Sequence, residues 1–127
     1  MKVYHVWFST KGRKPALEGE IGEDVKRLIK EIAQRTAIQV LEIEAAADHA
    51  HLLLALTDGQ TLPSVMHQLK GASARAVFLK YPDLRIDMKS KSFWQKDYGS
   101  REVTASEIDV VRLYIRTQSE RPLRHAD

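Results

Sequence analysis

The chain has 127 residues and no cysteine. That length fits one domain with a sizeable core, so we expect a single domain over residues 1–127. The lack of cysteine excludes disulfides, thiolate metal sites and thiol catalysis. A net charge of +3 permits a nucleic-acid partner without requiring one. No apolar segment is long enough to span a bilayer and no signal-peptide pattern is present, so we expect a soluble, cytoplasmic protein.

The first part of the chain predicts a strand, a helix and a second strand. β-Branched and aromatic residues over residues 3–9 are typical of a strand, and a basic loop follows. Apolar residues recur at helical spacing over roughly residues 18–35, which predicts an amphipathic helix. Partial alternation predicts a second strand over residues 40–45.

An almost wholly apolar run predicts a buried third strand, which ends at Asp58-Gly59. A second helix then opens with Pro63 near its first turn, where a missing N–H is harmless, and stops before Pro82. We expect a polar loop over residues 87–92 and short extended pieces at 92–95 and 98–103.

Thr104 and Glu107 form a capping box that opens a last helix, expected over residues 105–120. The resulting order is β-α-β-β-α-(β)-α. It predicts an α+β fold of the ferredoxin-like or RRM-like type, with an antiparallel sheet, helices on one face and a C-terminal helix carrying Tyr114.

Two histidines, His49 and His51, open the third strand and are separated by Ala50. Because side chains alternate along a strand, both imidazoles point to the same face. Such pairs occur by chance, and most histidines bind no ligand. Burial in an apolar strand, however, costs free energy unless each ring finds a partner, and a divalent metal is one such partner.

Tyr114 and Gln118 lie four residues apart on the last helix and therefore share one face. Tyr114 on its own is typical of a half-buried core tyrosine. A metal with two histidine ligands nevertheless needs oxygen donors, and a glutamine carbonyl can be one. A phenol one turn away is a usable nucleophile toward a metal-polarised phosphate. The helix is apolar around much of its circumference, as expected if it packs on two sides, one of them a core and the other a second subunit.

These residues, in this order, resemble the single-tyrosine HUH-type transposases of the smallest insertion sequences, the IS200-like transposases, and their REP-associated tyrosine transposase relatives. The resemblance runs along nearly the whole chain. It rests on the stretches Tyr4-His5-Val6-Trp7, Lys11-Gly12-Arg13-Lys14-Pro15, Asp48-His49-Ala50-His51-Leu52, Leu69-Lys70-Gly71-Ala72-Ser73-Ala74-Arg75, Phe93-Trp94-Gln95 and Tyr114-Ile115-Arg116-Thr117-Gln118.

The resemblance implies a role for each site residue. His49 and His51 match the paired histidines that bind a divalent metal, usually Mg²⁺ or Mn²⁺, and Gln118 matches a third ligand. Tyr114 matches the nucleophile that cleaves single-stranded DNA, leaving a 5′-phosphotyrosine and a free 3′-OH, and the reverse step joins strands. Tyr98 is a competing tyrosine, but it has no ligand-type residue at a matching spacing.

The resemblance also implies partners: single-stranded DNA with hairpin ends, and a homodimer in which the tyrosine helix of one subunit serves the metal site of the other. The residues alone leave open whether Tyr114 serves the histidines of its own subunit or those of a partner. Phosphate contacts should come from basic side chains. Our candidates are Arg13, Lys14, Lys70 and Arg75, although exposed charges are usually only solvated. We expect Trp94 and Phe93 in the core, His5 and His67 in structural or surface positions, and Asp48 pointing away from the imidazoles.

Two features depart from the family pattern. Residues 97–103 are less apolar than usual, and Ala47 stands where proline is usual before Asp48. Two alternatives stay open: a ferredoxin-like nucleic-acid-binding module without chemistry, in which Trp7 and Trp94 stack on bases, and a domesticated relative that binds DNA hairpins for its host.

Overall fold

The computed structural model describes residues 1–118, so the end of the last predicted helix, residues 119 and 120, lies outside the described part. The secondary-structure elements, in chain order, are β1 (Lys2–Ser9), η1 (Lys11–Arg13), α1 (Glu20–Arg35), β2 (Gln39–Ala45), β3 (His49–Leu56), α2 (Leu62–Lys80), α3 (Leu84–Asp87), β4 (Gly99–Val103), η2 (Ala105–Glu107) and α4 (Ile108–Arg116). Within residues 1–118, no helix is both long and apolar enough to cross a membrane.

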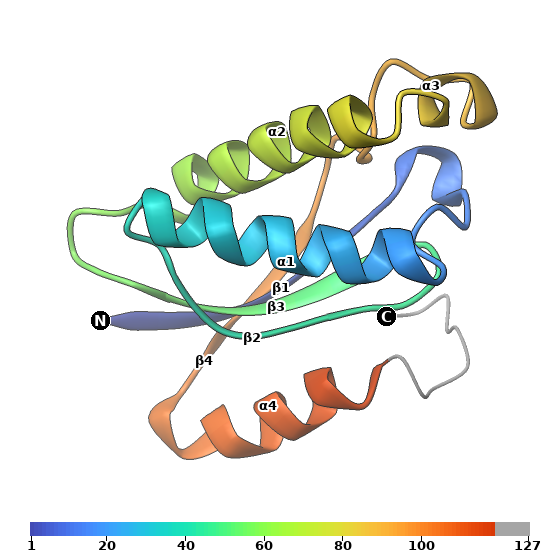
Figure 1. Ribbon diagram of the computed structural model, residues 1–127. Helices are drawn as coiled ribbons and strands as arrows, with labels where there is room; N and C mark the ends of the chain where they lie inside the picture. The colour runs from blue at the N-terminus through green and yellow to red at the C-terminus, as the bar shows by residue number, and fades with distance from the viewer. Residues whose placement is uncertain (119–127) are drawn as a thin grey trace.

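The four strands form one sheet in the order β2-β3-β1-β4, and every neighbouring pair is antiparallel. Two strand–helix–strand crossovers, through α1 and α2, place β1 and β3 at the centre (Figure 1). This is the ferredoxin-like layout that the sequence predicts.

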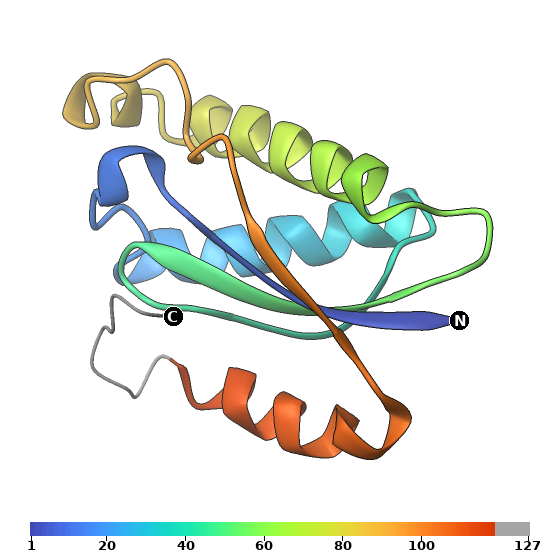
Figure 2. The same ribbon diagram turned by 180° about the vertical axis from the view of Figure 1, so that it is seen from behind.

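Helices cover both faces of this sheet. α1 and α2 lie side by side on one face, and α4 lies on the other (Figures 1 and 2). All eight residues of β3 are buried as a consequence. Leu52 and Leu54 join the large core beneath α1 and α2, whereas Leu53 joins a smaller cluster with Val111 and Ile115 of α4. Burial on both faces explains why β3 is a continuous apolar run.

The segment before β4 differs from the prediction. A short helix, α3, precedes the predicted loop, and residues 92–95 form no strand, although Trp94 makes an isolated bridge to Thr10. The Trp94 indole is buried, and its Nε1–H donates to Ser73 Oγ over 2.9 Å. The core position expected for Trp94 is therefore confirmed.

The capping box at Thr104 and Glu107 is present and opens the last helical segment. The regular helix α4 ends at Arg116, earlier than predicted, and the hydroxyl of Thr117, just after it, donates to the carbonyls of Leu113 and Tyr114. Such local side-chain bonds compete with continuation of the helix.

Candidate active site

The site begins on β3, whose His49 and His51 side chains share the face that α4 covers. Leu53, two residues further on, packs against α4, which identifies the face. His51 pairs with Trp7 of β1, and His5 lies two residues before Trp7, so alternation brings His5 to the same face.

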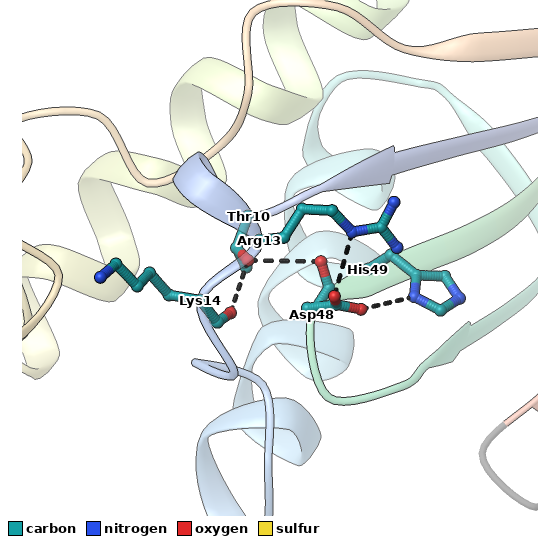
Figure 3. Close-up of polar contacts among 5 residues, drawn as sticks. All are labelled: Thr10, Arg13, Lys14, Asp48 and His49. Atoms are coloured by element: carbon teal, nitrogen blue, oxygen red, sulfur yellow. Dashed lines mark hydrogen bonds and ion pairs between the residues drawn. The ribbon is translucent and has the colours of Figure 1, made fainter. Parts of the chain in front are cut away.

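Asp48 fixes the orientation of His49. Its carboxylate accepts a hydrogen bond from His49 Nδ1 over 2.9 Å and an ion pair from Arg13 Nε over 3.1 Å (Figure 3). Our expectation that Asp48 points away from the imidazoles is wrong, because Asp48 precedes the strand and is not bound by its alternation. Burial raises the Asp48 pKa, but the bonds from His49 and Arg13 outweigh it and hold that pKa below its usual value.

His5 fixes the orientation of His51 in the same way. His5 Nε2 and His51 Nδ1 lie 2.9 Å apart in a buried hydrogen bond. Burial, together with the charge of Arg101, lowers the His5 pKa to about 4, and burial beside the other two histidines lowers the His51 pKa to about 3. Both rings are therefore neutral at pH 7, the state that metal coordination requires.

The remaining ring nitrogens point to a ligand. His49 Nε2 and His51 Nε2 are both buried, and neither has a hydrogen-bond partner among residues 1–118. Unpaired buried acceptors are costly, and neutral imidazoles are common ligands of divalent metals. The described residues contain no group of three or more His, Cys, Asp or Glu side chains that could hold a metal. A third protein ligand would therefore have to be another residue type, such as glutamine.

Tyr114 of α4 lies beside the histidines. Its ring centroid is 5.9 Å from that of His51 and 5.8 Å from that of His5, both edge-on. Gln118 is buried one turn later, and its Nε2 donates to the Tyr114 carbonyl over 3.2 Å. That bond uses the amide nitrogen, whereas a cation would need the amide oxygen.

A cleft of about 450 Å³ opens at this point between α4 and the sheet. His5, His51 and Tyr114 line it, together with Trp7, Arg101, Val110 and Val111. This volume is in the range of small-ligand sites, about 300–1,000 Å³, and exceeds what a lone metal ion needs.

Comparison with known proteins decides the family. The family described as "Transposase IS200 like" matches residues 2–118. This chain is a member of the IS200-like transposase family. Membership makes it a DNA transposase, an enzyme of a class that cleaves DNA.

Curated relatives agree. This transposase is 32% identical over 118 residues to the ISDra2 transposase TnpA of Deinococcus radiodurans. The aligned region covers 93% of this chain and 84% of the relative. This transposase is also 30% identical over 95 residues to the transposase of insertion sequence IS200 from Salmonella typhimurium, covering 75% of this chain and 62% of the relative.

Solved structures share the fold. A crystal structure of a candidate transposase from Deinococcus radiodurans R1 matches with a TM-score of 0.76 and 29% identity, covering 93% of this chain and 92% of the other. The REP-associated tyrosine transposase bound to a REP hairpin matches with a TM-score of 0.67, covering 91% of this chain and 65% of the other. At 13% identity, the second match shows a likeness of fold alone.

The four basic residues expected to contact DNA are placed differently in this transposase. Lys14 and Arg75 are exposed, and Arg13 is partly exposed beside Asp48. Lys70 Nζ instead donates to the carbonyls of Gln95, Lys96 and Asp97 over 2.7–3.0 Å. Through these bonds Lys70 fastens the loop of residues 95–97, and a phosphate contact from Lys70 stays a prediction.

His5 is the site residue that the sequence prediction missed. Its signal in the sequence was the stretch Tyr4-His5-Val6-Trp7, which carries part of the family resemblance, and the register between β1 and β3 was needed to place it against His51.

Proposed function

We propose that this transposase cleaves and rejoins single-stranded DNA through a covalent bond between Tyr114 and a 5′-phosphate. The observation that carries the proposal is the closeness of the Tyr114 ring to that of His51, 5.9 Å between centroids. His51 Nε2 is buried there and has no hydrogen-bond partner in the described part of the chain. Family membership supports DNA as the substrate.

We assign the metal site to His49 and His51, with Gln118 as a third ligand and Mg²⁺ or Mn²⁺ as the ion. A bound divalent ion would polarise the scissile phosphate and neutralise the charge that develops on it. Asp48 accepts only, so His49 Nδ1 carries the proton and Nε2 keeps its lone pair for the ion. When His51 Nδ1 donates its proton to His5 Nε2, His51 Nε2 likewise keeps its lone pair for the ion.

The chemistry then falls to Tyr114. Its phenolic oxygen attacks the phosphorus, and the bond from phosphorus to the 3′-oxygen breaks. The phenol loses its proton, and the departing 3′-oxygen gains one. Attack on the phosphotyrosine by a 3′-OH reverses the step and joins strands, so bond energy is conserved and no nucleotide cofactor is needed.

The substrate in this proposal is single-stranded DNA flanked by hairpin ends. Lys14 and Arg75 are exposed and would contact its phosphates, and the part of Arg13 not engaged by Asp48 would do the same. These contacts position the strand and carry no sequence information.

Tyr114 and His51 belong to the same chain, and α4 contacts β2 and β3 of that chain. This arrangement supports cleavage within one subunit. We further propose a homodimer that covers Val110 and Leu113, which are 71% and 59% exposed on α4 although apolar. Such a dimer would bury the second apolar side of the helix.

The test is incubation with end-labelled single-stranded hairpins and Mn²⁺, scored for a covalent protein–DNA band. The hairpins should come from the DNA that flanks this gene. We expect a band with the wild type, none with Tyr114→Phe and none in EDTA. A band of unchanged intensity with Tyr114→Phe would remove the tyrosine assignment, and hairpin binding with no band under any condition would favour a binding module.

A further inference from the structure

Trp7 lines two neighbouring hollows of this protein, and the proposed reaction gives this residue no role. It lines the active-site cleft with His51 and Tyr114. It also lines a neighbouring hollow of about 400 Å³, to which Lys11, Arg13 and Lys96 contribute positive charge and Asp97 a negative one. The indole therefore stands where a chain passing from the basic hollow into the cleft would cross β1.

Gly99 makes room for this indole. Trp7 and Gly99 are partners across β1 and β4, and a Cβ on Gly99 would lie 2.2 Å from the indole atoms Cε2 and Nε1. The Trp7 ring thus lies against bare β4 backbone, and only glycine permits this. Trp7 is half-buried, unlike Trp94, which is 5% exposed.

The cleft beyond Trp7 combines charge with apolar surface. Arg101 pairs with His5 across β4 and β1, and its side chain is 49% exposed. Its ion pair with Glu107 is long, at 3.4 Å, and exposed, so it binds the guanidinium weakly. Val111, on the α4 side, gives the cleft an apolar wall. An aromatic plane, a guanidinium and an apolar wall match the base, phosphate and sugar of one nucleotide.

We propose that this is a nucleotide subsite, in which one unpaired base of the substrate strand stacks on Trp7 and an adjacent phosphate contacts Arg101. The inference rests on the proposed function, because it seats the strand whose phosphate Tyr114 attacks. Stacking on an aromatic ring tolerates any base, so the subsite positions the strand without selecting its sequence.

The test uses tryptophan fluorescence, since the chain has only two tryptophans. The Trp94→Phe variant reports on Trp7 alone. It is titrated in EDTA with the single-stranded 12-mers dT12 and dA12, and with a 12-mer of abasic sugar-phosphate units. We expect saturable quenching by dT12 and dA12 and at least tenfold weaker binding of the abasic strand. In Trp7→Ala, fluorescein-labelled dT12 should bind roughly tenfold more weakly and no better than the abasic strand, since stacking contributes about 1–3 kcal/mol per base.

Trp7→Tyr is the matched variant, because it keeps an aromatic plane and should retain the preference for dT12 over the abasic strand. Equal affinity of the wild type for the two strands, binding without a fluorescence change, or no binding of dT12 would each overturn the proposal. We expect no cleavage in EDTA, and the Tyr114→Phe variant titrated in the same way makes the binding result independent of Tyr114 chemistry. Base-dependent binding without a covalent band in Mn²⁺ would contradict only the proposed function.

Discussion

His5 Nε2 lies 2.9 Å from His51 Nδ1. This hydrogen bond joins a histidine of β1 to His51, whose Nε2, like that of His49, has no hydrogen-bond partner within residues 1–118. Asp48 makes the equivalent bond to His49. Each of the two candidate histidine ligands is therefore held by a partner on its other ring nitrogen, as in established histidine metal sites.

Loss of the His5 partner should weaken metal binding. We expect His5→Ala to lower Mn²⁺ affinity by roughly 10–100-fold, the usual effect of removing such a partner, when affinity is measured by calorimetry. His5→Asn, whose amide oxygen can accept the same bond, should recover part of the loss. His67→Ala is the control, because His67 is exposed. Unchanged affinity in His5→Ala would contradict an orienting role for His5.

The metal-free protein should lose stability in acid. The pKa values of His5 and His51 are lowered to about 4 and 3 in the folded protein, below the ordinary 6.5, so the unfolded chain binds more protons between these values. The free energy of unfolding should then fall as the pH drops below 6.5, by up to about 1.4 kcal/mol per pH unit for each extra proton bound. Urea titrations should show a shallower fall for His51→Asn than for wild type or His67→Asn. An equal fall in all three proteins would show that His51 is not a source of the loss of stability in acid.

The packing of the Trp7 indole against Gly99 can be tested by substituting Gly99, with Gly59 as the control position. Gly99→Ala should destabilise the fold by about 1–3 kcal/mol, because its Cβ would overlap the Trp7 indole. Gly59→Ala is the matched control, since no atom of residues 1–118 beyond its own chain neighbours lies within 4 Å of a Cβ at that position. It should change stability by less than about 0.5 kcal/mol. Urea unfolding checks both variants. Equal stabilities would mean that the indole does not lie against Gly99.

Cleavage within one subunit can be tested with heterodimers whose two subunits carry different inactivating substitutions. A heterodimer of Tyr114→Phe with His49→Ala/His51→Ala, purified through two different tags, should form no covalent DNA band, because neither chain holds both halves of the site. A heterodimer of the wild type with the double histidine variant should form one. A band on Tyr114 in the first heterodimer would show that the tyrosine serves the partner's histidines.

Patterns along the chain predicted most of the fold. Periodicity indicated α1, the prolines Pro63 and Pro82 marked the ends of α2, and alternation placed His49 and His51 on one face. All three signals depend only on local geometry. The contact between His5 and His51 depends on the register of β1 against β3, which no local pattern contains. The direction of Asp48 likewise depends on Arg13, 35 residues away along the chain. Lys70 bonds backbone carbonyls on a distant loop, and composition does not show such partners.

The central claim is that Tyr114 forms the bond to DNA. Its most direct test is to isolate the covalent adduct formed in Mn²⁺, digest the protein with trypsin, and identify by mass spectrometry the residue that carries the 5′-phosphate. We predict the nucleotide on Tyr114, in a peptide that also contains Leu113. A nucleotide on Tyr98, or on any other residue, would contradict the account.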